Sequence, residues 1–218
     1  MNRRSVIFSA AALALAAGAG LVFSMGGPAP VGMALAQDED VDTSRVVEMS
    51  MGNPDAPVTV IEYASFTCPH CRAFHEGPFK QLKADYIDTG RIHFIYREVY
   101  FDRFGLWAGM LARCAGPDRY FGLAEMIYGT QQEWLGNGDP ATIAENLRKM
   151  GRTAGLTNEQ VDACLQDGDM ARALVAVYQQ NAEADGIDST PSFLIDGEKY
   201  SNMSYEEFSG ILEEKLGS

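Results

Sequence analysis

Two short runs in the first half of the chain are rich in apolar, β-branched and aromatic residues, and both predict β-strands. They cover residues 58–63 and 92–99, and the second alternates its side chains between two faces as a sheet strand does. Between them, residues 69–88 space their apolar side chains as an α-helix does, with a kink predicted at Gly77 and Pro78. This half of the chain therefore predicts a β-α-β unit.

A long helical block follows this unit. From about residue 104 to residue 185 the apolar spacing is helical, with breaks where glycine and proline interrupt it. Strand patterns return at residues 192–195 and 198–200, separated by an Asp-Gly turn, and residues 204–216 close the chain as a helix. This order of elements predicts an α/β domain that is interrupted by an all-helical insertion.

The N-terminal segment, residues 1–36, has the composition of an export signal. Two arginines precede a long uncharged and apolar run that ends in small residues. We expect cleavage after Ala36, although the run is long enough to be retained as a membrane anchor instead. Residues 37–57 form an acidic N-terminus, which we expect to be mobile, and a lead-in to the first strand. These features predict a periplasmic protein.

The excess of acidic over basic residues makes some classes of binding partner improbable. Residues 1–36 contain two arginines and no acid, so the rest of the chain keeps 15 basic residues against 30 acidic ones, a net charge of −15. Such an acidic protein is a poor partner for nucleic acid. The remaining length fits one domain with no separate dimerisation domain, so we expect a monomer. Four cysteines in an exported chain predict disulfide chemistry.

The residues that carry this chemistry are Cys68, Pro69, His70 and Cys71, which stand between the first strand and the first helix. Proline is favoured at the first position of a helix, so Cys68 is the expected N-cap. There, unpaired backbone N–H groups and the positive end of the helix dipole stabilise a thiolate. We expect the ring of His70 to favour the same thiolate. The pattern predicts thiol–disulfide exchange.

Residues 60–71, which end in this motif, and residues 189–193 together resemble the DsbA-like thiol–disulfide oxidoreductases. The resemblance spans nearly all of the mature chain. It implies a thioredoxin-like fold with an all-helical insertion. In this sequence the fold would consist of residues 58–101, the insertion 102–186, and residues 187–218. It also implies an enzyme that needs no cofactor.

The same resemblance implies roles for individual residues. Cys68 is the nucleophile, and Cys71 resolves the mixed disulfide. Pro191 is the cis-proline that faces the nucleophile, and Thr190 supplies backbone contacts to a bound substrate strand. Glu62 is the buried acid near Cys71.

The resemblance further implies an oxidase that gives its disulfide to reduced, unfolded exported proteins and is re-oxidised by a quinone-linked membrane partner. Thr190 departs from the valine that is common in the oxidases of the family, and threonine at this position also occurs in isomerase-like relatives. A disulfide isomerase or reductase of the same fold is therefore the alternative.

Glu62 is unusual without any resemblance, because it stands in the middle of an otherwise apolar strand. A buried carboxyl at this position could accept and return the proton of Cys71, whereas the simpler interpretation is an exposed strand face.

Cys114 and Cys164 follow apolar residues at helical spacing in separate helical segments. In an oxidising compartment they predict a structural disulfide, and the alternative is two buried free thiols.

A metal site is the alternative of another class. Cys68, Cys71 and His75 could bind zinc or copper, with His93 as a fourth ligand. Against this, the chain has one C-x-x-C motif, and no second pair of ligands has the spacing of a zinc site. A binding module whose cysteines are incidental would not need a proline directly after Cys68.

Overall fold

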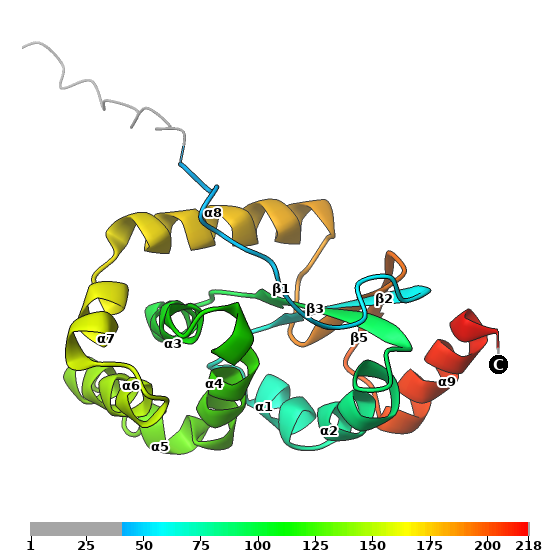
Figure 1. Cartoon of the computed structure of the whole chain (residues 1–218), viewed down its shortest axis with the longest axis horizontal. Helices are drawn as coiled ribbons and strands as arrows, with labels where there is room; N and C mark the ends of the chain where they lie inside the picture. The colour runs from blue at the N-terminus through cyan, green and yellow to red at the C-terminus, as the bar shows by residue number, and fades with distance from the viewer. Residues whose placement is uncertain (1–40, 218) are drawn as a thin grey trace, which may run out of the picture. The chain divides into compact units, whose positions relative to one another are not determined.

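The computed structural model describes residues 41–217 (Figure 1). The predicted signal segment 1–36 and the first residues of the acidic N-terminus lie outside this range. Within the range, every helix is too short or too polar to cross a bilayer.

Five strands form one mixed sheet in the order β1-β3-β2-β4-β5. Strands β2 and β3 run parallel, and every other neighbouring pair is antiparallel. The strands are β1 (Met49–Gly52), β2 (Val58–Ala64), β3 (Ile92–Glu98), β4 (Ser192–Ile195) and β5 (Glu198–Ser201). Because β2 is central, neighbours on both sides hold its C-terminal end, where the chain enters the cysteine motif.

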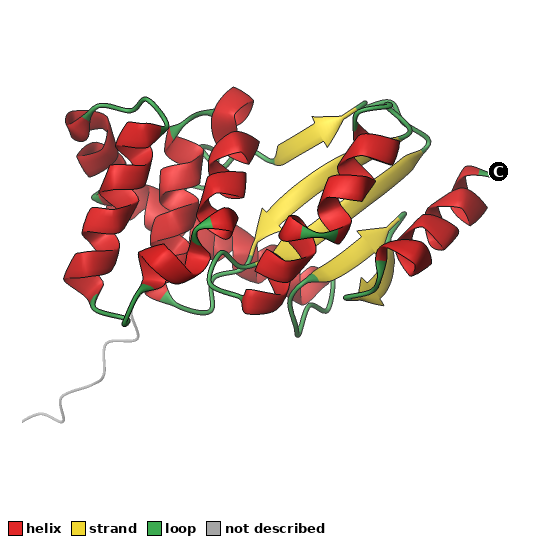
Figure 2. Ribbon diagram, turned by 90° about the horizontal axis from the view of Figure 1, so that it is seen from below, coloured by secondary structure: helices red, strands yellow, loops and turns green. Residues whose placement is uncertain are grey.

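Helices cover both faces of this sheet. Helices α1, α2 and α9 lie on one face and α8 on the other (Figure 1), and the remaining helices of the insertion gather beside the sheet (Figure 2). The insertion runs from α3 to α8, between β3 and β4. The helices are α1 (Pro69–Glu76), α2 (Pro78–Leu82), the π-helical turn η1 (Lys83–Ile87), α3 (Arg103–Cys114), α4 (Pro117–Gly129), α5 (Gln131–Leu135), α6 (Pro140–Thr153), α7 (Asn158–Leu165), α8 (Gly168–Ala184) and α9 (Tyr205–Leu216).

Strand β2 divides its side chains between two hydrophobic cores, as alternation along a strand requires. Val60 and Ala64 belong to the larger core, and Tyr63 belongs to a smaller one against α8. In the larger core, Phe74 of α1 contacts Phe193 of β4 with ring centroids 4.8 Å apart. Full burial of such a side chain contributes about 1.5–3 kcal/mol, so this contact fixes α1 on the sheet.

The structure confirms the predicted α/β fold and its helical insertion, but it adds a strand that the sequence analysis missed. Strand β1 lies within residues 37–57, for which we had predicted only a mobile terminus and a lead-in. It pairs antiparallel with β3, with Met49 opposite Tyr96. The segment Met-Ser-Met-Gly is short and follows acidic residues, so its strand conformation comes from this pairing and not from its own pattern.

The predicted helix over residues 69–88 is interrupted near the expected kink and then changes type. Helix α1 ends at Glu76 with Gly77 as its C-cap, and α2 begins at Pro78, whose ring cannot continue the preceding hydrogen-bond ladder. The last part is the π-helical turn η1, in which the backbone N–H of Asp88 donates to the carbonyl of Lys83.

Candidate active site

Cys68 lies at the N-terminus of α1, directly beyond the C-terminal end of strand β2. Its backbone is extended, with φ −77° and ψ 122°, which makes it the N-cap, and Pro69 occupies the first helical turn. Cys68 is half-buried, whereas Cys71, inside the helix, is fully buried. The two sulfurs of the motif therefore differ in access: Cys68 can be reached from solvent and Cys71 cannot.

The two thiols also differ in acidity. A hydrogen bond from the Cys71 side chain, with further ones from Thr190 and from the backbone N–H groups of Cys71 and His70, lowers the pKa of Cys68 to about 5. Burial raises the pKa of Cys71 far above its ordinary value, and the hydrogen bond to Cys68 and the charge of Glu62 raise it further. At neutral pH the reduced site therefore holds a thiolate at Cys68 and a thiol at Cys71.

The loop that precedes β4 contains Thr190 and Pro191 and lies next to Cys68. The Thr190–Pro191 peptide bond is cis, and Pro191 is buried. When protonated, the Cys68 thiol donates to the carbonyl oxygen of Thr190 over 3.5 Å. The pairing of β4 with β2, with Ser192 opposite Tyr63, brings this loop to the cysteine motif.

Glu62 is fully buried on β2 and pairs with His75 of α1. Its two carboxylate oxygens lie 3.0 Å and 2.9 Å from Nε2 of His75. The sequence pattern suggested His75 only as a metal ligand, so its contact with Glu62 was not predicted. Its spacing was an available signal, because His75 stands four residues after Cys71 and so shares its helix face.

The helical insertion holds the active-site loop from two positions that the sequence analysis missed. The carboxylate of Asp102, the N-cap of α3, accepts a hydrogen bond from the hydroxyl of Thr67 at 2.6 Å. The side-chain amide of Gln131 in α5 donates to the backbone carbonyls of Phe66 and Cys68 at 2.9 Å and 3.0 Å. Gln131 lies more than 60 residues away along the chain, so no local pattern could have revealed this contact.

The side chain of His70 is exposed, and the contact with Cys68 described above is made by its backbone N–H. The role predicted for the ring of His70 stays a prediction.

Within residues 41–217, no three His, Cys, Asp or Glu side chains are arranged to hold a metal ion. The metal-site alternative required Cys68, Cys71 and His75 to come together as ligands, and the structure does not arrange them in this way. Nε2 of His75 is directed to the carboxylate of Glu62.

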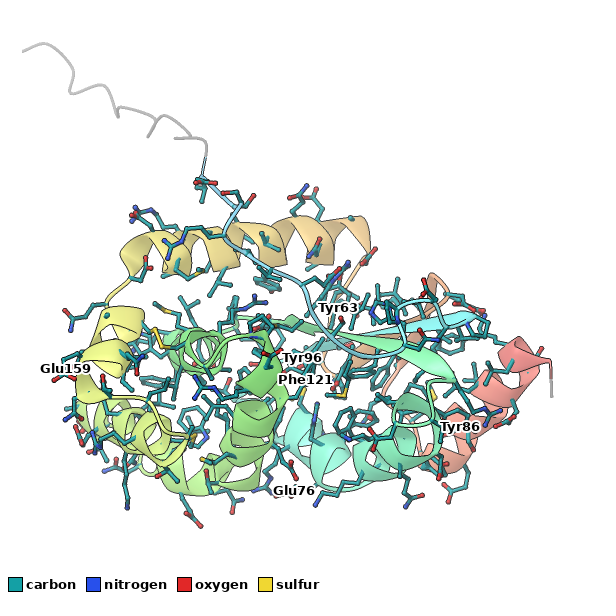
Figure 3. The ribbon with its side chains drawn as sticks, in the orientation of Figure 1. Tyr63, Glu76, Tyr86, Tyr96, Phe121 and Glu159 are labelled. Carbon is teal, nitrogen blue, oxygen red and sulfur yellow. A yellow bond between two sulfur atoms is a disulfide. The ribbon has the colours of Figure 1, made fainter. Side chains whose placement is uncertain are left out.

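The remaining two cysteines are joined to each other. A disulfide links Cys114 of α3 to Cys164 of α7, with Cα atoms 6.0 Å apart (Figure 3). It closes a loop within the helical insertion.

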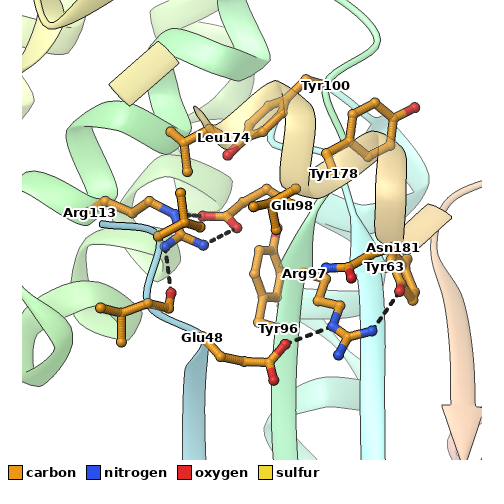
Figure 4. A pocket seen from close by; sticks show the side chains of 13 residues that line it. Glu48, Tyr63, Tyr96, Arg97, Glu98, Tyr100, Arg113, Leu174, Tyr178 and Asn181 are labelled. Atoms are coloured by element: carbon orange, nitrogen blue, oxygen red, sulfur yellow. Dashed lines mark hydrogen bonds and ion pairs between the residues drawn. The ribbon is translucent and has the colours of Figure 1, made fainter. Parts of the chain in front are cut away.

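A polar cavity of about 250 Å³ lies between α8, β3 and residues 46–48 (Figure 4). Its charged side chains are paired with one another. Arg113 forms a bidentate ion pair with Glu98, and Arg97 bonds to Glu48 and to the hydroxyl of Tyr63. Neither cysteine of the motif lines this cavity, so the candidate chemistry lies elsewhere.

The chain is similar to a thioredoxin family profile and to proteins that are named for disulfide chemistry. A family profile described as thioredoxin matches residues 44–214. The "Putative protein-disulfide oxidoreductase" of Rickettsia bellii is 33% identical over 170 residues, which cover 78% of this chain and 64% of that protein. "Disulfide bond formation protein D" of Bacillus subtilis is 26% identical over 187 residues, which cover 76% of each chain. The chain thus spans slightly less than two thirds of the Rickettsia protein's length.

A solved structure shows the same fold. The crystal structure of α-DsbA1 from Wolbachia pipientis superposes with a TM-score of 0.73 at 26% sequence identity, and it covers 78% of this chain and 91% of that one.

Proposed function

Because the chain belongs to the DsbA-like family of thioredoxin-fold disulfide oxidoreductases, we propose that it is a disulfide oxidase that passes the Cys68–Cys71 disulfide to exported proteins. One observation carries this proposal: Cys68 lies half-buried at the N-cap of α1, where hydrogen bonds lower its pKa to about 5, whereas Cys71 is fully buried, which raises the pKa of its thiol. A sulfur with a low pKa leaves readily from a mixed disulfide, and a stabilised thiolate favours the reduced form of the enzyme. Both effects favour the transfer of a disulfide to the substrate.

The reaction proceeds in two exchanges. A substrate thiolate attacks Sγ of Cys68, the Cys68–Cys71 bond breaks, and Cys71 leaves as a thiolate that takes up a proton. A second substrate thiolate then attacks the substrate sulfur of the mixed disulfide, and Cys68 leaves as a thiolate. The substrate loses two electrons and gains a disulfide, and the enzyme gains the same two electrons.

The surroundings of Cys68 support the roles proposed for its neighbours. Pro191 and Thr190 lie beside the attacked sulfur, where an extended substrate segment can be aligned by backbone contacts to Thr190. Glu62, whose charge acts on Cys71, handles the proton of that thiol.

We place this activity in an extracytoplasmic compartment, where re-oxidation of Cys68 and Cys71 is the task of a quinone-linked membrane protein. The signal-like composition of residues 1–36 supports this placement. The disulfide chemistry in the names of the relatives supports it as well, because disulfides form and persist in oxidising compartments.

The proposal is tested by incubating the oxidised protein with a reduced, unfolded substrate protein that needs disulfides for activity. We expect stoichiometric oxidation of the substrate by the parent and none by Cys68→Ser. In parallel, a substrate with scrambled disulfides is offered to the reduced protein. Efficient reshuffling of this substrate without net oxidation of the first one would replace the oxidase assignment with an isomerase.

A further inference from the structure

A cavity of about 260 Å³ borders His75, at the opposite end of α1 from Cys68. Its walls come from α2, η1, α4 and the edge strand β1. Figure 3 labels Phe121 of α4, one of the lining residues. Since Cys68 does not line this cavity, water in it reaches the site from a different side than a substrate does.

Three side chains connect the cavity to the buried thiol. Cys71 and His75 are four residues apart on α1, so they lie one above the other on the same helix face. Glu62 of β2 faces both of them: its carboxylate contacts Nε2 of His75 at 2.9 Å, and its charge acts on Cys71. Nδ1, the second ring nitrogen of His75, has no hydrogen-bond partner within the described residues, while the residue itself lines the cavity.

Two tyrosine rings pack against the imidazole of His75, and neither phenol is an acid near neutral pH. The ring of Tyr128 from α4 stacks on His75 with centroids 4.3 Å apart, and Tyr96 of β3 meets the imidazole edge-on. The two tyrosine hydroxyls bond to each other, and burial raises the pKa of both phenols well above the ordinary value. The other charged groups at the cavity, Lys80, Lys83 and Glu125, belong to its lining and not to the contact between Glu62 and His75.

We propose that His75 is the residue through which the proton of Cys71 enters and leaves, by passing it between Glu62 and water in this cavity. The inference rests on the proposed function, because only thiol–disulfide exchange requires Cys71 to gain and lose a proton. His75 does not touch the substrate, so it acts through Glu62 as a positioning and relay residue.

The protons balance over a full cycle. When Cys71 leaves the disulfide as a thiolate, cavity water protonates Nδ1 of His75, the Nε2 proton passes to Glu62, and Glu62 protonates Cys71. On re-oxidation Cys71 returns its proton to Glu62, which returns one to Nε2, and Nδ1 releases one to the cavity. The imidazole ends in the tautomer in which it began.

The test isolates the step in which Cys71 gives up its proton. The reduced protein is mixed rapidly with glutathione disulfide and quenched with acid at successive times. Mass spectrometry then measures the fractions of reduced protein, glutathione adduct and closed disulfide. First, the thiolate of Cys68 attacks glutathione disulfide to form a Cys68–glutathione adduct and release one glutathione thiolate. Second, Cys71 loses its proton and attacks Cys68, which closes the Cys68–Cys71 disulfide and releases the second glutathione. The first step does not need His75, whereas the second does.

Two variants interrupt the route in different places. His75→Gln keeps a hydrogen-bond donor for Glu62 but cannot carry a proton, and Gly122→Leu narrows the cavity while leaving His75 and Glu62 intact. A Cβ atom at Gly122 meets nothing within 4 Å, so the substitution starts from open space. The matched control is Gly129→Leu, in the same helix, equally free of contacts and outside the cavity lining.

We expect His75→Gln to close its disulfide about tenfold more slowly or worse, and so to accumulate the adduct, with the first step unchanged. Gly122→Leu is expected to slow closing in the same way, and Gly129→Leu to match the parent. Added imidazole should restore closing in His75→Ala, in which the cavity extends to Glu62. Parental closing rates in His75→Gln would overturn the relay, and parental rates in Gly122→Leu would overturn the route through the cavity. Failure of the parent to form any adduct would instead contradict the proposed function.

Discussion

The side-chain amide of Gln131 donates a hydrogen bond to the backbone carbonyl oxygen of Cys68 over 3.0 Å, and a second one to that of Phe66 over 2.9 Å. These bonds attach the helical insertion to the loop that carries the nucleophile. Gln131 is only 3% exposed, so the two carbonyls have no ready access to replacement water if the amide is removed.

Replacement of this amide should therefore be costly. We expect Gln131→Met, which keeps the length of the side chain, to lower the free energy of unfolding by about 1–3 kcal/mol because two buried acceptors lose their donor. Urea unfolding of the reduced proteins measures this. Gln132→Met, at the exposed neighbouring position, is the control. Equal stability of the Gln131→Met and Gln132→Met proteins would contradict a stabilising role for the two hydrogen bonds of Gln131.

The Cys114–Cys164 disulfide should be the main covalent support of the helical insertion. The cross-link spans a sequence separation of 50, for which the chain-entropy model gives a stabilisation of about 4 kcal/mol. We expect the Cys114→Ala, Cys164→Ala double variant to lose most of this stabilisation, which thermal or urea unfolding measures. Mild reduction that opens only Cys68–Cys71 should expose two thiols, and the appearance of four would show that the second bridge is not protected.

The buried ion pair between Arg113 and Glu98 should matter more than exposed pairs of similar length. Its side chains are 10% and 4% exposed, and the N–O distance is 2.6 Å. We expect Arg113→Met to cost about 3–5 kcal/mol, because the charge of Glu98 is left buried without its partner. Arg148→Met, which breaks a more exposed pair of the same length with Asp162, should cost less than about 1 kcal/mol in the same unfolding assay. Equal losses would contradict this assignment.

The stability of the reduced protein should depend on pH through Cys68. Its folded pKa of about 5 lies below the value of about 8.5 for an unfolded thiol. The resulting stabilisation is fully present above the unfolded value and is lost as pH falls through the folded one. The difference in unfolding free energy between the reduced parent and reduced Cys68→Ala should therefore grow as pH rises from about 5 to about 8.5. A difference independent of pH would exclude a stabilised thiolate.

Local sequence rules accounted for the elements that carry their own signals. Pro69 after Cys68 predicted a helix N-terminus, and α1 begins at this proline. Glu62 in an apolar strand predicted a buried acid or an exposed face, and the structure buries it fully.

The features that were missed all depend on contacts between distant segments. Strand β1 exists because Met49 and its neighbours pair with β3, and Gln131 reaches Cys68 only after the insertion folds back on the sheet. The spacing of His75 placed it on the helix face of Cys71, but this signal did not single out Glu62 as its partner, because a histidine near two cysteines also fits a metal site.

The central claim is that Cys68 is a stabilised thiolate next to a protonated Cys71, and thiolate absorbance of the reduced protein followed against pH tests it most directly. The account predicts one transition of a single thiol with a midpoint near 5, which disappears in Cys68→Ala. A midpoint at or above about 8.5, the value of a free thiol, or a transition that remains in Cys68→Ala, would contradict it.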